Sequence, residues 1–220
     1  ADGKPYKSSG GAMVRSELGD IPEGWRVGEL SDISNISIGR TPPRQELEWF
    51  STNERDIKWI SIRDMGNCGV YIFNTSEYLT REAVKRFNIP IIPEDTVIIS
   101  FKLTVGRIAI STENMLSNEA IASVKINHEY LNTEYVYLFL KQYNFSFLGS
   151  TSSIAIAVNS KSIKSICILI PDKQNIDIFK EYVESVFLKI KLNAGQIQTL
   201  TKTRDALLPK LMSGQLRVKE

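Results

Sequence analysis

The sequence predicts an α+β fold: a globular domain of short mixed strands and helices, followed by one long projecting coiled-coil helix. Three observations favour this class. Apolar runs of strand length are irregularly spaced and are broken by helical patterns. The last quarter of the chain carries apolar residues at alternating steps of three and four. Finally, 220 residues, 42% of them hydrophobic and 24% charged, suffice for one core plus an extension.

The start of the chain is expected to lie outside the fold. Residues 1–12 are rich in Gly, Ser and Lys, so residues 1–16 read as an expression tag or a disordered tail. The globular domain is expected over residues 17–171. It opens with a turn at residues 19–25 and continues in short strands to Ile36.

The middle of the chain combines strands with short helices. Thr80 is expected to cap a helix that ends at Phe87, and Asn132 a helix that ends near Tyr143. Residues 63–67 are expected to form a turn. The strands, recognised by their β-branched and aromatic content, are expected at residues 57–62, 70–73, 95–101, 107–110, 120–126 and 165–170.

One long helix closes the chain. It is expected to be capped by Asp172 and to run to about Leu208, just before Pro209. At 1.5 Å per residue it would be roughly 50 Å long. The helical segment is assigned to residues 172–212, and residues 213–220 form a short tail. Its heptad seam comprises Ile176, Phe179, Val183, Val186, Ile190, Asn193, Ile197, Leu200, Arg204, Leu207 and Leu211.

The seam has two interpretations. A helix packed on its own domain usually has an apolar stripe that is wider than a heptad seam. Here the flanking positions are polar, so packing against a partner helix is favoured, and a helix folded back on its own domain is the alternative. The flanking residues are Lys180, Glu184, Lys189, Lys191 and Gln198.

The composition of the chain argues against some classes of function but does not identify one. The formal net charge of +2 is near balance, so a basic surface for nucleic acid must be a local patch. Cys68 and Cys167 are the only two cysteines and lie far apart, which is typical of a reduced, cytoplasmic protein. No apolar run approaches 18 residues, so no membrane span is expected.

Signatures of catalysis are missing from the sequence. It has no glycine-rich phosphate loop, no dinucleotide-binding fingerprint and no nucleophile elbow. His128 is the only histidine, and a catalytic triad or a metal site would need partners for it. We therefore predict no catalytic residue, no metal site and no cofactor in this chain, and expect a recognition function.

Four segments carry a resemblance to a known family. They read ELGDIPEGW (17–25), VGRIAI (105–110), GST (149–151) and LLPKLMSGQLRV (207–218). In order and spacing the chain resembles the specificity subunits of type I restriction-modification enzymes over almost all of residues 17–219. It departs from the family where the long helix begins: Gln174 is kept, but the usual run of prolines before it is not.

The resemblance implies a target recognition domain followed by a spacer helix. Family members usually hold two such units, whose spacer helices pack antiparallel so that each domain reads half of a split site in double-stranded DNA. The present sequence holds one unit, either a natural half-subunit or one half of a longer chain; its two ends look like those of C-terminal halves. The family's subunit is not an enzyme. Modification subunits with S-adenosylmethionine methylate the site, and restriction subunits with ATP and Mg cleave the DNA.

The seam fits such pairing. Its midpoint falls between Asn193 and Ala194, so two antiparallel helices would bring the Asn193 side chains together, and a polar seam residue specifies register. Gly195 would let the backbones approach. The hypothesis is an antiparallel homodimer, or pairing with a second half. A spacer of roughly 50 Å corresponds to about 15 base pairs, enough for half-sites about one turn apart.

Reading residues are expected in loops, because arginine suits guanine and phosphate, asparagine suits adenine, and hydroxyls suit either. The rival function is a dimeric coiled-coil scaffold whose α+β head binds a protein or a small ligand. The candidates for DNA contact are Arg40, Arg44, Arg63, Lys102, Thr104, Arg107, Ser152, Asn159 and Lys161.

Overall fold

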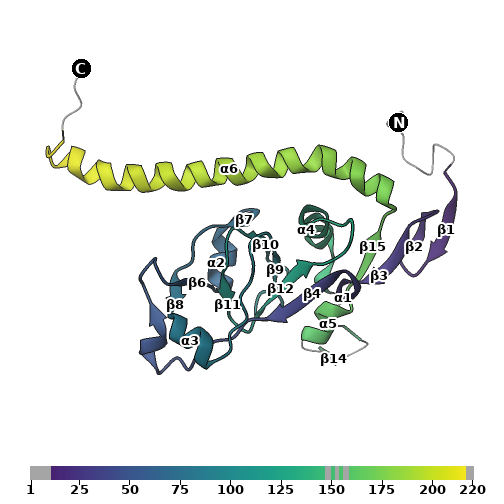
Figure 1. Cartoon of the computed structure of the whole chain (residues 1–220), viewed down its shortest axis with the longest axis horizontal. Helices are drawn as coiled ribbons and strands as arrows, with labels where there is room; N and C mark the ends of the chain where they lie inside the picture. The colour runs from purple at the N-terminus through teal and green to yellow at the C-terminus, as the bar shows by residue number, and fades with distance from the viewer. Residues whose placement is uncertain (1–10, 147–149, 152–153, 156–158, 217–220) are drawn as a thin grey trace, which may run out of the picture.

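An α+β domain lies along one side of a single long helix in the computed structural model (Figure 1). The structure describes residues 11–146, 150–151, 154–155 and 159–216. Strands and short helices interleave along the chain as far as Ile170, and the helix takes up nearly all the rest. The predicted fold class is confirmed.

The centre of the domain is a five-stranded sheet in the order β4-β12-β9-β10-β7. Its strands pair antiparallel except for β7, which runs parallel to β10. Every residue of β9 and β10 is buried, because helices or loops cover both faces of these strands. The strands are β4 (Ser34–Ile38), β7 (Tyr71–Ile72), β9 (Val97–Ser100), β10 (Ile108–Ser111) and β12 (Ile121–Ile126).

A second, four-stranded sheet has the order β11-β6-β8-β5. Trp59 lies at its centre and is fully buried. The sheet is flanked by η2 (Leu47–Trp49) and α3 (Arg81–Arg86), and Thr80 caps α3 as predicted. The strands are β5 (Phe50–Ser51), β6 (Ile57–Ile60), β8 (Glu77–Leu79) and β11 (Leu116–Ser117).

Three two-stranded sheets complete the strands: β1 (Met13–Ser16) with β2 (Gly19–Pro22), β3 (Arg26–Glu29) with β15 (Cys167–Ile170), and β13 (Ser150–Thr151) with β14 (Ile154–Ala155). The expectation of a disordered tail is therefore wrong for Met13–Ser16. The other short helices are α1 (Leu30–Ile33), α4 (Thr133–Gln142) and α5 (Ser160–Lys164). Asn132 caps α4 as predicted.

Two short helices form where a strand and a turn were predicted. Leu30–Ile33 forms α1, and Ile62–Asn67 forms α2 where a turn was expected. The reason in α2 is a capping box: the Ser61 hydroxyl accepts from the Asp64 N–H at 3.2 Å, and the Asp64 carboxylate accepts from the Ser61 N–H at 2.9 Å. These bonds satisfy backbone donors that a helix start leaves free.

The long helix α6 spans Lys173–Met212, 40 residues, or about 60 Å at 1.5 Å per residue. Asp172 caps it as predicted. The expected end before Pro209 is wrong, because the helix continues through this proline to Met212. Nor does α6 project from its first turns: Ile176 is 1% exposed within the domain core. Every residue from 202 to 216 is exposed.

Candidate nucleic-acid interface

Most of the candidate DNA-contacting residues gather at one end of the five-stranded sheet, here called the loop end. β4 and β9 finish at this end and β10 begins there, so the segments 39–44 and 101–107 meet. α2 leads into β7, which is parallel to β10, so α2 joins them. The loop end therefore carries Arg40, Arg44, Arg63, Lys102, Thr104 and Arg107.

Arg44 is occupied by the protein itself. Its guanidinium donates two hydrogen bonds to the Glu77 carboxylate, at 2.7 and 3.0 Å. The same group lies 4.5 Å from the ring centroid of Phe50 and 4.7 Å from that of Trp59. A paired and stacked guanidinium of this kind positions a loop. The residue thus holds the 39–44 segment on the second sheet.

Arg40 is only partly engaged in bonds within the protein. Its backbone N–H donates to the Ser117 carbonyl at 2.9 Å, and its side chain donates to the Phe87 carbonyl at 3.0 Å. The preceding Gly39 lies so close to Ser117 that a Cβ there would overlap the carbonyl oxygen. The loop is therefore fixed, while the exposed Arg40 guanidinium keeps further N–H groups for a ligand.

Arg107 is structural as well. It is half-buried, and its guanidinium donates to the Ile62 carbonyl at 2.6 Å. The guanidinium also lies against Gly66, where a Cβ would overlap it. Arg107 thus joins the start of β10 to α2 and holds Arg63, which α2 carries, at the loop end.

Arg63, Lys102 and Thr104 are the candidates whose side chains remain open to a ligand. All three are exposed. The Lys102 ammonium lies 5.6 Å from the centroid of the Phe101 ring, and the Arg63 guanidinium has no hydrogen bond or ion pair to any described residue. Two cations and one hydroxyl form a small set that suits phosphates and base edges.

Glu119 adds a carboxylate to the loop end. Burial alone would raise its pKa, but a hydrogen bond from the Thr41 hydroxyl and the nearby charges of Lys102 and Arg44 outweigh burial, so its pKa is lowered. The group is therefore ionised at neutral pH. A carboxylate among cations can accept from the amino group of cytosine.

Asn159 and Lys161 do not join this set. Asn159 caps α5: its side-chain oxygen accepts from the backbone N–H groups of Lys161 at 2.9 Å and Ser162 at 3.1 Å. α5 packs on α1, which leads into the start of β4, at the far end of the sheet. Lys161 is exposed there. Ser152 lies outside the described residues.

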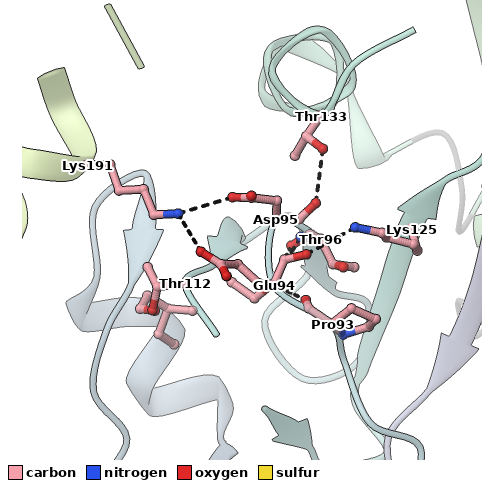
Figure 2. Close-up of polar contacts among 10 residues, drawn as sticks. Pro93, Glu94, Asp95, Thr96, Thr112, Lys125, Thr133 and Lys191 are labelled. Atoms are coloured by element: carbon pink, nitrogen blue, oxygen red, sulfur yellow. Dashed lines mark hydrogen bonds and ion pairs between the residues drawn. The ribbon is translucent and has the colours of Figure 1, made fainter. Parts of the chain in front are cut away.

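A polar cluster at the opposite end of the sheet ties α6 to the domain (Figure 2). The Lys191 ammonium contacts the Glu94 carboxylate at 2.9 Å and the Asp95 carboxylate at 3.3 Å. Thr133 donates to the Asp95 carbonyl at 3.0 Å, and Lys125 donates to the Glu94 carbonyl at 3.1 Å. The sequence pattern placed Lys191 at a solvated flank of the seam, and no local signal links it to acids almost a hundred residues earlier.

The inward face of α6 uses part of the predicted seam. Ile176, Val183 and Ile190, spaced seven residues apart, pack into the domain core, and Phe179 lies edge-on to Tyr135 at 5.7 Å. For these residues, packing on the chain's own domain is the observed arrangement, as the alternative interpretation expected. Phe187, outside the seam, joins them in the core.

The outward row of α6 is the part of the seam that the chain itself leaves uncovered. Its exposed members are Val186, Asn193, Ile197, Leu200, Leu207 and Leu211. Gly195 lies outside this row; a Cβ added there would lie 3.8 Å from the ring of Phe73, an ordinary van der Waals contact.

His128 has the surroundings of a turn residue. Its ring packs edge-on against Tyr130 at 4.6 Å, and one ring nitrogen lies 3.2 Å from the Arg26 guanidinium. Burial, then the Arg26 charge, lowers its pKa. Across the described ranges, His, Cys, Asp and Glu nowhere gather in threes that could hold a metal ion. Likewise, none of the helices described could cross a membrane on the basis of length and apolar content.

Curated relatives match nearly the whole chain. It is 30% identical over 200 residues to the type I restriction enzyme HindI specificity subunit of Haemophilus influenzae, covering 89% of this chain and 42% of that protein. It is 28% identical over 236 residues to the MjaIX specificity subunit of Methanocaldococcus jannaschii, covering 100% of this chain and 50% of the relative. The chain thus spans about half the length of these relatives.

Solved structures agree on the fold. The crystal structure of the HsdS subunit from Thermoanaerobacter tengcongensis superposes with a TM-score of 0.59 at 17% identity, over 91% of this chain and 48% of that one. The family model of the type I restriction modification DNA specificity domain matches residues 22–202. This match takes in both the sheets and most of α6, and the chain therefore belongs to the family of type I restriction modification DNA specificity domains.

Proposed function

We propose that this chain is a non-catalytic unit that recognises one half of a bipartite DNA site within a type I restriction-modification complex. The observation that carries the proposal is the family match over residues 22–202. Methylation, with S-adenosylmethionine, and cleavage, with ATP and Mg, would belong to the modification and restriction subunits that this unit docks. The proposed division is a recognition domain to residue 171 and a spacer helix from residue 172.

The loop end is the surface proposed to meet the duplex. Arg40 and Lys102 would contact phosphates, which fix the register of a protein on DNA. Arg63 and Thr104 would reach base edges, because guanidinium and hydroxyl groups suit these contacts. Arg44 and Arg107 would act indirectly, by holding the loops that carry the others. Since the loops are anchored by the bonds described above, binding would cost little ordering entropy.

The outward row of α6 is the surface proposed for pairing. A second α6, from another copy or from the second half of a longer chain, would pack antiparallel along Val186, Leu200 and Leu207. The Asn193 side chains of the two helices would meet near the twofold axis and set the register. Support comes from the exposure of these apolar residues on one side of a helix whose other side is buried in its own domain.

Duplex binding tests the recognition proposal. The chain, with its methyltransferase partner, is titrated against duplexes selected from a randomised pool over a range of salt concentrations. We expect affinity to fall as salt rises, and Lys102→Ala to weaken binding by about 1 kcal/mol, roughly fivefold, while lowering the salt slope by about one. Lys164→Ala is the matched control: this lysine is equally exposed but lies on α5, at the far end of the sheet. It should leave affinity unchanged.

Two outcomes would contradict the recognition proposal. Absence of duplex binding, even with the partner present, would favour a scaffold whose head binds a protein or a small ligand. Binding that does not depend on salt would exclude phosphate contact. Equal losses for Lys102→Ala and Lys164→Ala would show that the loop end is not the reading surface.

Sedimentation tests the pairing proposal. Leu200→Glu places a charge in the outward row and is expected to convert a dimer at micromolar concentration into a monomer. Leu47→Glu is the matched control, since this leucine is similarly exposed, 76% against 67%, but lies in η2 and not on α6. A wild-type chain that is monomeric, and that also fails to bind a second half, would sink the pairing proposal.

A further inference from the structure

Leu103 is the most exposed large apolar side chain in the described part of the chain, at 95%. It stands in the loop between β9 and β10, at the loop end. An exposed leucine alone needs no explanation. The backbone conformation of Leu103 does need an explanation, because its φ is +62°. A left-handed conformation costs a residue with a Cβ roughly 1–2 kcal/mol. The chain therefore accepts strain to hold an apolar side chain in solvent.

The loop that presents Leu103 is firmly closed. The Ser100 N–H donates to the Arg107 carbonyl and the Gly106 N–H donates to the Ser100 carbonyl, both at 2.9 Å. The Thr104 N–H bonds back to the Lys102 carbonyl at 2.7 Å. Strained residues persist where the surrounding structure fixes them, and such strain is found at functional positions. A rigid tip also loses little entropy on binding.

The neighbours of Leu103 suit a polyanion. Lys102 and Thr104, on either side in the chain, are both exposed. Arg63 lies at the same end of the sheet, held through the bond between Arg107 and Ile62. Proteins that kink DNA insert a single apolar side chain between base pairs while nearby cations hold the phosphates. Leu103, between Lys102 and Thr104 at a rigid loop tip, provides the apolar side chain and the neighbouring cation that such insertion uses.

We propose that Leu103 inserts as a wedge between two adjacent base pairs of the bound duplex, with Lys102 on a neighbouring phosphate. The inference rests on the proposed DNA-recognition function and extends it. Insertion requires unstacking, which is least costly at pyrimidine–purine steps. Leu103 would therefore add a preference for a flexible step at one fixed position of the half-site, without any hydrogen bond to a base.

Base stacking can be followed with 2-aminopurine, whose fluorescence rises when it unstacks. The probe is placed in turn at each position of a duplex selected from the randomised pool, and the full chain is added. We expect a several-fold rise at one step only. Leu103→Ala should abolish the rise and weaken binding about tenfold, whereas Leu103→Met, which keeps a long apolar side chain, should retain most of both.

Two controls separate this effect from loss of folding. Leu47→Ala removes another exposed leucine, 76% exposed, from η2 beside the second sheet and should leave the signal intact. Thermal unfolding of Leu103→Ala should match the wild type, because the side chain is almost wholly solvated.

The outcomes are distinct. Salt-dependent binding without a fluorescence rise at any step would overturn the wedge and leave the recognition function standing. No duplex binding by the wild type, either alone or with the methyltransferase partner, would overturn both. If Leu103→Ala left the fluorescence rise in place but disturbed assembly with the methyltransferase subunits, the side chain would meet protein, and the wedge would be refuted.

Discussion

Replacing Lys191 with methionine tests how the long helix is held on the α+β domain. Methionine keeps an unbranched apolar stem beside Tyr71, over whose ring the ammonium lies at 5.6 Å, and removes only the charge. The two ion pairs with Glu94 and Asp95 join a lysine that is 25% exposed to carboxylates that are more than half exposed. Exposed pairs contribute up to about 1 kcal/mol each. We expect Lys191→Met to lower the free energy of unfolding by about 1 kcal/mol, or roughly 3 °C in Tm.

The effect should depend on pH in a defined direction. Burial alone would lower the pKa of Lys191, but its bonds to Glu94 and Asp95 outweigh burial and raise the pKa above the ordinary value of 10.5. A raised pKa in the folded state means that the stabilisation is complete below pH 10.5 and is lost as the pH rises through the folded-state value. The difference between wild type and variant should therefore be constant from neutral pH to about pH 10 and shrink above it.

Lys189→Met is the matched control for this variant. Lys189 lies on the exposed side of the same helix and makes no hydrogen bond or ion pair with any described residue, so its substitution should change stability by less than about 0.5 kcal/mol. A double-mutant cycle with Asp95→Asn isolates the pair; asparagine tolerates the left-handed backbone at that position, where φ is +54°. Equal losses for the two lysine variants, or full additivity in the cycle, would refute the reasoning.

Two further changes test the loop end and the start of α6. Gly39→Ala should lower the free energy of unfolding by about 3 kcal/mol, because its Cβ would overlap the Ser117 carbonyl; in denaturant titration Gly69→Ala, with open space around it, should be nearly neutral. Asp172→Ala should cost about 1 kcal/mol through loss of the cap. The bond from the Asn175 N–H lowers the pKa of Asp172, so stability is present above pH 3.8 and fades as the pH falls through the lower folded-state value; a loss unchanged at pH 2 would contradict this.

Sequence reasoning succeeded where a local pattern has one physical meaning. Thr80, Asn132 and Asp172 cap the helices they were expected to cap, because a short polar side chain ahead of a helical pattern satisfies the free N–H groups there. α2 was missed because its glycine and asparagine are typical of turns. The capping box between Ser61 and Asp64 is the signal that could have found it.

The heptad seam exposes a different limit. Apolar spacing shows which side of a helix is covered, but not by what. In α6, Ile176, Val183 and Ile190 pack into the chain's own core, while Val186 and Leu200 remain exposed. Apolar spacing alone therefore cannot tell which of these residues pack on the chain's own domain and which stay exposed.

The candidate site was predicted in part for a related reason. Residue type and loop position brought together most of the loop end, but they cannot reveal a partner far away in sequence. Arg44 and Arg63 look alike in the sequence, yet Arg44 is bonded to Glu77, 33 residues later. The amide of Asn159 suits an adenine edge by residue type, but in the structure its side chain caps α5.

The Lys191 cluster and the loop end lie at opposite ends of the same strands, so a small rotation at one end displaces the other. β9 runs four residues, Val97–Ser100, from one end to the other, or about 13 Å. α6 is attached to the domain both at this cluster and through Ile176, Val183 and Ile190, which pack into the core. A rocking motion of 10° about the Lys191 cluster would move the tip at Leu103 by roughly 2 Å, enough to break a hydrogen bond to a base. In the proposed function, the stiffness of this attachment would therefore limit how sharply the loop end discriminates sequence.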